Sequence, residues 1–237
     1  MIPRIIHYCW FGRGPMPEFA LNCIESWHKY MPDYAYKLWN EASFDVDSTP
    51  YTKEAYEARK FAFVSDFVRL KALKEEGGIY FDVDFEVYKP FDVLLRLKAF
   101  AGFEGSKHNP VMMGVIASEP NGEWVNEMLE HYRDRHFLID GKMDLTTNVR
   151  FISSIMKDNG FSLDGKEQDY KDLHVFPVEY FSPRLTTGEY HRTENTYCEH
   201  KGITSSWAKK SFKSRLLSCF TPEFRTRLVL LKRKLIG

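Results

Sequence analysis

The pattern of apolar and polar positions predicts a helix that leads into a short buried strand within Phe61–Glu86. Apolar residues recur there at three- and four-residue intervals, the spacing of one face of an amphipathic helix. Gly77–Gly78 ends that pattern, as glycines commonly end helices. The run Ile79–Phe81 is short, apolar and bounded, which is typical of a buried strand in an α/β sheet. Two carboxylates, Asp82 and Asp84, follow it directly.

Strands and helices alternate before this unit. We expect a strand over residues 5–10, a helix over 18–30, a strand over 34–39 and a helix over 50–59. Such alternation predicts an α/β fold, a mainly parallel sheet flanked by helices on both faces. Beyond the carboxylates the pattern favours strands that start near residues 100 and 111, a helix over 123–132 and a turn at 140–142.

Composition and cysteine usage agree with one folded domain that carries an appendage. The chain has 237 residues, of which 43% are hydrophobic and 16% aromatic, which excludes a disordered protein. The beginning of the chain does not resemble a signal peptide and no apolar run is long enough to span a bilayer, so we expect a cytoplasmic protein. No two of the four cysteines show C-x-x-C spacing, so we expect reduced thiols rather than a zinc site or disulfides. They are Cys9, Cys23, Cys198 and Cys219.

The formal net charge of zero conceals a charge asymmetry. From Ser205 onward there are nine basic residues and one acid, which leaves the preceding part acidic. Thr221–Glu223 has the composition of a helix start, and apolar residues then recur at helical spacing beside the basic ones. We therefore expect a folded α/β domain over residues 1–207 and a basic amphipathic helical tail over residues 208–237, which could lie on an anionic membrane surface.

Asp82 and Asp84 are candidate metal ligands. Because side chains alternate along a strand, Asp82 and Asp84 should project to the same side and can converge on one ligand. Carboxylate oxygens suit Mg²⁺ or Mn²⁺, which commonly share them with substrate phosphates, and ligands bind at the carboxyl ends of strands in open α/β sheets. The Asp-x-Asp pattern alone is weak, and we interpret its second occurrence, Asp45–Asp47, as a polar turn. Asp66 and Arg69, three residues apart, should neighbour each other on one helix face.

Several segments together resemble glycosyltransferase family 32, the DXD sugar transferases, and more distantly the glucosylating clostridial toxins. The densest match is the run 62–69 followed by 77–84, and the opening block 5–12 supports it. Two later segments, 177–183 and 193–200 leading to a Ser-Trp pair at 206–207, extend the resemblance to the end of the predicted domain. Only one histidine stands where family members often have two. The resemblance implies a GT-A fold, Rossmann-like in its sheet.

The resemblance also implies roles for individual residues. Asp66, Arg69, Asp82 and Asp84 would be catalytic, with Asp84 the first ligand of Mn²⁺ or Mg²⁺ and Asp82 bound to ribose or to the metal through water. Asp66 and Arg69 would orient the donor sugar, and His200 would be a further metal ligand. The nucleotide-sugar site would also include His7, Trp10, Tyr80 and Trp207. Trp10 would stack on the base, whereas His7 either lines the pocket or is a hydrogen-bonded core histidine. Thr146–Asn148 could place polar groups beside the sugar.

A member of this family transfers a sugar from a nucleotide sugar with retention of anomeric configuration. We expect a UDP-sugar, or GDP-mannose as second choice, and a glycan or lipid-linked acceptor in capsule, lipopolysaccharide or other surface polysaccharide synthesis. The residues themselves leave the donor sugar, the acceptor, the linkage and the stereochemistry open.

Two other classes of function are compatible with parts of the sequence. A phosphatase with an aspartate nucleophile also places Asp-x-Asp after a buried strand, although there the pair follows the first strand. The basic tail could instead belong to a non-catalytic membrane or nucleic-acid adaptor. The acidic body argues against a nucleic-acid partner.

Overall fold

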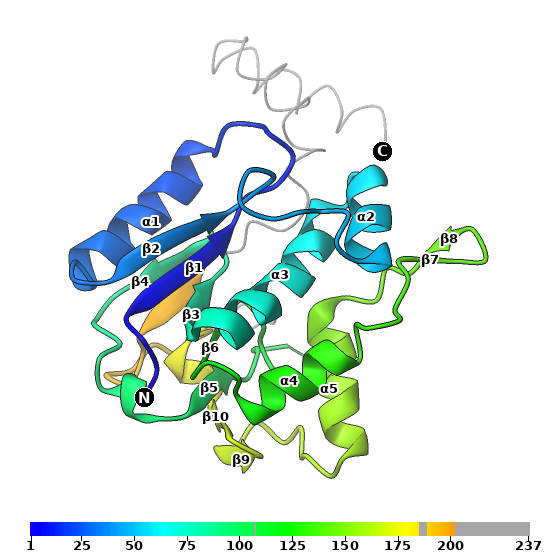
Figure 1. The fold of residues 1–237 in the computed structure, drawn as a ribbon. Helices are drawn as coiled ribbons and strands as arrows, with labels where there is room; N and C mark the ends of the chain where they lie inside the picture. Colours follow the sequence, from blue (N-terminus) through cyan, green and yellow to red (C-terminus); the bar gives the residue numbers. More distant parts are fainter. Residues whose placement is uncertain (107, 185–188, 202–237) are drawn as a thin grey trace, which may run out of the picture. The chain divides into compact units, whose positions relative to one another are not determined.

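The computed structural model describes residues 1–106, 108–184 and 189–201 (Figure 1). Trp207, the predicted domain boundary and the predicted tail helix lie outside them. The elements before the Asp-x-Asp turn are β1 (Ile5–Cys9), α1 (Glu18–Tyr30), β2 (Ala35–Trp39), α2 (Pro50–Glu57), α3 (Phe61–Glu76) and β3 (Gly78–Phe81). Those after it are β4 (Phe85–Val87), β5 (Ala99–Gly102), β6 (Val115–Ser118), α4 (Glu123–Glu130), β7 (Leu138–Ile139), β8 (Lys142–Met143), α5 (Asn148–Asp158), β9 (Gln168–Tyr170), β10 (Leu173–Phe176) and β11 (Cys198–His200).

Seven strands form one sheet in the order β2-β1-β3-β6-β5-β10-β9. Strands β2, β1, β3, β5 and β10 run in the same direction, while β6 and β9 are antiparallel to their neighbours. The expectation of a mainly parallel α/β sheet is therefore confirmed. A separate antiparallel pair joins β4 to β11, and β7 and β8 form a small hairpin at the predicted turn.

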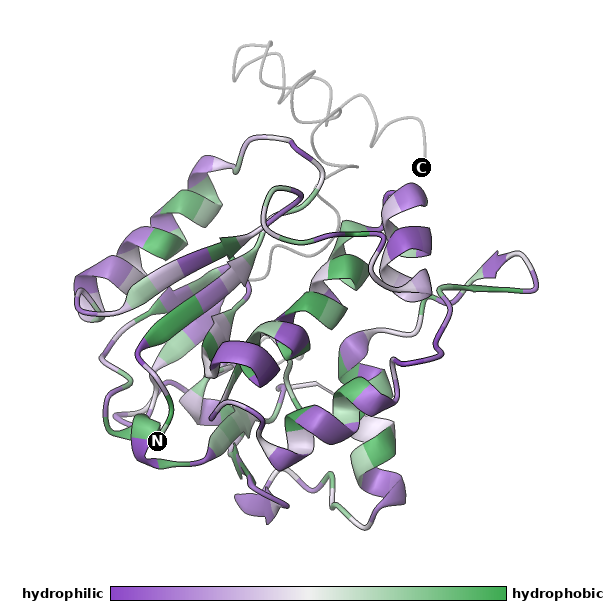
Figure 2. Ribbon diagram, in the orientation of Figure 1, coloured by the Kyte–Doolittle hydropathy of each residue, from purple (hydrophilic) through white to green (hydrophobic). Residues whose placement is uncertain are grey.

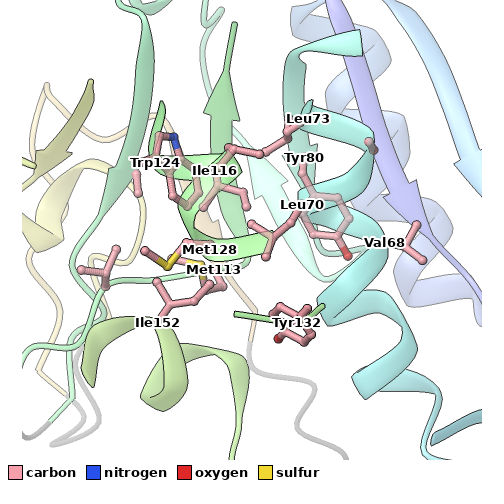
Figure 3. Packing of buried hydrophobic residues seen from close by; sticks show 14 of the residues in the cluster. Val68, Leu70, Leu73, Tyr80, Met113, Ile116, Trp124, Met128, Tyr132 and Ile152 are labelled. Carbon is pink, nitrogen blue, oxygen red and sulfur yellow. The ribbon is translucent and has the colours of Figure 1, made fainter. Parts of the chain in front are cut away.

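The sheet has a hydrophobic core on each face, because successive strand residues point to opposite sides. Tyr80 of β3 packs with Leu70, Leu73 and Trp124 from α3 and α4, as Figure 3 shows. The neighbours of Tyr80 in β3 face the other way, and Phe81 stacks on the fully buried Trp27 of α1. In Figure 2 the hydrophobic colour runs along the central strands and the inward sides of the helices. Helices thus cover both faces, as predicted.

Gly77 and Gly78 make the sharp passage from α3 into β3. Both have left-handed backbone angles, with φ of +65° and +103°. A Cβ atom on Gly78 would lie 2.6 Å from the carbonyl oxygen of Ile5 in β1. Only glycine combines this angle with this close approach, so the pair fixes where β3 enters the sheet beside β1.

Some elements were not predicted from the sequence. Helix α5 begins after Thr147, whose hydroxyl accepts from the amide of Arg150 at 3.5 Å. Strands β4, β9, β10 and β11 have only three or four residues each, too few for periodicity to identify them. Within the described residues, we find no helix with the length and apolar character needed to cross a bilayer.

Candidate active site

A small cavity lies where β3, β5 and α5 meet. Its volume is about 80 Å³. The polar part of its wall comes from α3, the turn after β3, the segment after β5, the first turn of α5 and β11. The lining residues are Arg69, Asp82, Phe85, Glu104, Met112, Met113, Gly114, Asn148, Val149, Ser182 and His200. The carboxyl ends of β3 and β5 both face this cavity, which is where α/β sheets bind ligands.

Arg69 is the central cation of the site. Its guanidinium lies 2.9 Å from Asp66 Oδ1 and 3.3 Å from Asp82 Oδ1, and it also donates to the backbone carbonyl of Met113. The ring of Tyr80 lies beneath it, with the guanidinium carbon 4.6 Å from the ring centroid. Burial alone would lower the pKa of Arg69, but the neighbouring negative charges raise it. The predicted Asp66–Arg69 pair is therefore present, buried rather than at the surface.

Asp66 is the most strongly perturbed carboxyl group of the site. Desolvation raises its pKa to about 6, while the charge of Arg69 acts in the opposite direction. The Nδ2 of Asn148 donates to the backbone carbonyl of Asp66 at 3.3 Å. Asn148 is buried and lines the cavity, as expected for a polar group beside the sugar, whereas Thr146 and Thr147 are exposed.

The two carboxylates of the Asp-x-Asp motif do not converge as the strand rule predicted. Strand β3 ends at Phe81, and residues 82–84 form a turn into β4 in which side chains no longer alternate. Asp82 accepts a hydrogen bond from the Tyr80 hydroxyl at 2.8 Å and faces Arg69. Asp84 instead faces β11, where His200 Nε2 donates to its Oδ2 at 2.9 Å.

His200 reaches Asp84 through strand pairing across more than a hundred residues. Strand β11 pairs antiparallel with β4, which places His200 opposite Phe85, and the two rings stack with centroids 4.8 Å apart. Burial lowers the pKa of His200, but its hydrogen bond with Asp84 and the surrounding acidic charges outweigh burial and raise the pKa. The structure thus brings together two of the three residues that the resemblance named as metal ligands, while the third, Asp82, faces Arg69 instead.

We tested whether these residues suit a divalent cation. Oδ1 of Asp84 is buried and has no hydrogen-bond partner among the described residues, so these leave one carboxylate oxygen for another ligand. In the described ranges no three His, Cys, Asp or Glu side chains come together as a metal cluster. Mg²⁺ and Mn²⁺ sites with one or two protein ligands completed by substrate phosphates need no such cluster. Asp84 and His200 fit that kind of site.

Three residues that the resemblance assigned to the nucleotide-sugar site make other contacts in the structure. His7 is fully buried; its Nε2 donates to the carbonyl of Gly77 at 2.8 Å and its Nδ1 accepts from Trp39 at 3.1 Å. This corrects its assignment as a nucleotide ligand and supports the alternative, a core histidine. Tyr80 is 1% exposed and acts on the site through Asp82 and Arg69. Trp10 follows β1, is half-buried and donates to the Gly14 carbonyl at 2.7 Å.

Glu104 is a site residue that the sequence did not indicate as functional. It follows β5, lines the cavity, and its pKa is raised by burial although the charge of His200 opposes this. Its position depends on β5 lying next to β6 in the sheet, which no local pattern reveals.

Comparison with known proteins finds a family match in the first half of the chain. Residues 17–101 match the family described as "Glycosyltransferase sugar-binding region containing DXD motif". The chain carries the DXD sugar-binding region of glycosyltransferases. The match confirms the resemblance inferred from sequence. It contains α3, β3 and the Asp-x-Asp turn but ends before Glu104, Asn148 and His200.

Similar curated proteins include Glucan organizing enzyme 1 of Cryptococcus neoformans, 35% identical over 56% of this chain and 44% of the relative. Mannosyl phosphorylinositol ceramide synthase CSH1 of Saccharomyces cerevisiae is 26% identical over 66% of this chain and 43% of the relative. The chain thus spans less than half the length of these relatives. A solved structure titled "PaToxG Glycosyltransferase" has a TM-score of 0.46 and 22% identity, covering 54% of this chain and 59% of that one.

Proposed function

We propose that this DXD glycosyltransferase moves a sugar from a nucleotide sugar to a glycan or lipid-linked acceptor, with Mn²⁺ or Mg²⁺ bound by Asp84 and His200. The observation that carries the proposal is a small cavity lined by Arg69, Asp82 and His200, of which Arg69 forms a buried ion pair with Asp66 and His200 is hydrogen-bonded to Asp84. The first pair offers donors and acceptors to sugar hydroxyls. The second pair offers ligands to a cation that also binds a diphosphate.

The residues of the site have different roles in the proposed transfer. Asp66 and Asn148 are fixed by Arg69 and by each other, so they can hold the donor sugar in one orientation at little further cost in entropy. Arg69 is a fixed positive charge in a water-poor site, suited to stabilise negative charge that develops nearby. When bound, the cation would supply Lewis-acid stabilisation of the leaving diphosphate. Retention of configuration remains part of the proposal.

The name of one relative narrows the choice of nucleotide-sugar donor. The sequence favoured a UDP-sugar with GDP-mannose second, but the relative from yeast is named as a mannosyl phosphorylinositol ceramide synthase. Its name supports a mannosyl donor, and its product supports a lipid-linked acceptor. We therefore propose GDP-mannose first and UDP-sugars second, and keep surface polysaccharide synthesis as the wider setting.

The experiment that tests the proposal is incubation with a panel of nucleotide sugars and Mn²⁺. We expect slow hydrolysis of one donor to free sugar and nucleoside diphosphate, lost on addition of EDTA and restored by excess Mn²⁺. Release of inorganic phosphate from simple phosphate esters, without consumption of any nucleotide sugar, would instead favour the phosphatase alternative.

Trp10→Ala should weaken donor binding more than turnover. A stacking surface for the base contributes equally to the ground state and the transition state, so its loss raises KM and leaves kcat nearly unchanged. We expect a rise in donor KM of roughly 5- to 100-fold, corresponding to about 1–3 kcal/mol for one stacked base. Initial rates over a donor concentration series measure this. An unchanged KM would remove Trp10 from the nucleotide site.

The basic tail carries a separate proposal on location. We propose that residues after Thr221 bind the anionic inner face of a membrane, so that the protein is cytoplasmic and peripheral. Truncation before Thr221 should leave donor hydrolysis unchanged but abolish co-sedimentation with anionic vesicles. A full-length variant with Lys232, Arg233 and Lys234 changed to Glu is the matched control and should bind as poorly as the truncated form. Equal binding by all three proteins would contradict the proposal.

A further inference from the structure

Glu104 lies in the cavity wall. The proposed function uses its carboxylate neither for the donor nor for the metal. Its backbone amide donates to the Pro110 carbonyl at 2.8 Å, so the residue is anchored at the end of β5. Within the described ranges its side chain accepts one hydrogen bond, a long one of 3.4 Å from the Ser106 hydroxyl. No lysine, arginine or histidine of those ranges forms an ion pair with it. The described residues therefore use little of its capacity to accept hydrogen bonds.

A partly buried carboxylate with so little compensation costs stability. Asp66 and Asp82, by contrast, share the charge of Arg69, and Asp84 is bound to His200. Among the described residues, Glu104 is thus the acidic group of this cavity that has no strong partner. Such a group at a ligand-binding edge is a candidate for contact with a substrate.

The order of strands places Glu104 away from the nucleotide side of the site. Trp10 follows β1, Asp82 follows β3, and Glu104 follows β5, with β6 between the last two. Neighbouring strands are about 4.8 Å apart, so β5 is roughly 10 Å from β3. In the proposed function the nucleotide lies over β1 and the diphosphate beside the Asp-x-Asp turn. The space beside β5 is then left for the acceptor.

The polar lining of the cavity comes from separate segments of the chain. Arg69 belongs to α3 and Asn148 to α5, and the proposed function assigns these two residues to the donor sugar. Glu104 and Ser182 belong to the segments after β5 and after β10. Glu104 is also not part of a ready metal cluster, since no three metal-binding side chains gather in the described part of the chain.

We propose that Glu104 binds a hydroxyl group of the acceptor, a polyol such as a sugar or inositol ring, by accepting its hydrogen bond. This inference rests on the proposed glycosyltransferase function. A carboxylate pairs well with a polyol because it offers two strong acceptor oxygens. Glu104 therefore determines how tightly the acceptor is bound, while the residues of α3 and α5 bind the donor.

Glu104→Gln separates these roles. It keeps the shape of the side chain but replaces one charged oxygen with an amide donor. The assay supplies the donor that the wild-type protein hydrolyses with Mn²⁺. Methyl α-D-mannopyranoside and myo-inositol are the acceptor probes, and both transfer product and free sugar are measured. We expect the ratio of transfer to hydrolysis to fall roughly 10- to 100-fold, the loss of one charge-assisted hydrogen bond, while hydrolysis without acceptor stays within about twofold.

Two further variants control for damage to the segment. Ser106→Ala removes the recorded side-chain partner of Glu104 and should leave both rates unchanged. Glu104→Asp keeps the charge on a shorter stem and should lose less transfer than Glu104→Gln. Circular dichroism melts verify that all variants fold, and if the glutamine variant does not, the aspartate variant carries the test through its acceptor KM.

The outcomes are distinct. An unchanged transfer ratio in Glu104→Gln, with the wild-type protein active, overturns the acceptor role. An equal loss of hydrolysis and transfer also overturns it, since Glu104 would then serve the donor, the cation or a covalent step. A wild-type protein that consumes no nucleotide sugar refutes the glycosyltransferase function itself, and this inference falls with it.

Discussion

Replacing Asp84 with asparagine should abolish sugar transfer while leaving the fold intact. Asp84 has one oxygen bound to His200 and one buried oxygen without a partner among the described residues, so its charge is available to a cation. Asparagine keeps the shape but removes the charge that holds the cation against the leaving diphosphate. We expect a loss in kcat of roughly 100- to 1000-fold or more, the size of effect that follows loss of transition-state charge stabilisation. Rates at saturating donor and Mn²⁺ measure it.

Asp47→Asn is the matched control for this change. Asp47 belongs to the other Asp-x-Asp pattern, where its backbone amide is hydrogen-bonded to Asp45 in an exposed turn. Its substitution should change neither turnover nor the dependence on Mn²⁺. If Asp84→Asn kept near-normal turnover under saturating conditions, the assignment of Asp84 to the cation would be wrong.

Arg69→Met should cause the largest combined loss of stability and activity. The guanidinium is buried and serves Asp66, Asp82 and the Met113 carbonyl at once, so its removal leaves two carboxylates and a carbonyl without their partner. Breaking a buried pair by removing one member typically costs about 3–5 kcal/mol. Urea unfolding at pH 8 measures this, and donor hydrolysis should become undetectable.

The stability deficit of Arg69→Met should shrink as the pH falls. The pKa of Asp66 is already raised from its ordinary 3.8 to about 6 by burial, and loss of Arg69 removes the charge that opposes this rise. A carboxyl whose folded pKa is raised loses stability as the pH rises from its unfolded pKa through its folded pKa. The deficit should therefore be smaller at pH 5 than at pH 8. Arg69→Lys, which keeps a charge but not the planar fork, should lie between the wild type and methionine. A pH-independent deficit would contradict this account of the pair.

Local sequence relations predicted the part of the site that lies on one helix. Asp66 and Arg69 neighbour each other because helix geometry fixes residues three apart, whatever the rest of the fold does. The sequence revealed the Asp-x-Asp motif but did not predict the directions of its two side chains. The strand rule fails at Phe81, where hydrogen bonding to β6 ends and the chain turns toward β4.

The remaining residues depend on contacts between distant segments. His200 meets Asp84 only because a three-residue strand pairs with β4, and Glu104 enters the cavity only because β5 lies beside β6. His7 lies within the opening block 5–12 that carries the resemblance, yet hydrogen bonds to Trp39 and Gly77 occupy both of its ring nitrogens. Sequence alone could not separate these outcomes, because each depends on contacts with an element elsewhere in the chain.

The pairing of β4 with β11 has a consequence for synthesis of the protein. Residues 85–87 leave the ribosome long before residues 198–200, which complete the pair. The family-matched region can therefore be fully translated while Asp84 still lacks His200. A nascent chain or a prematurely terminated product ending before Cys198 would hold its helix α3 cluster but not its cation pair, so assembly of the catalytic centre is postponed until the domain is almost entirely synthesised.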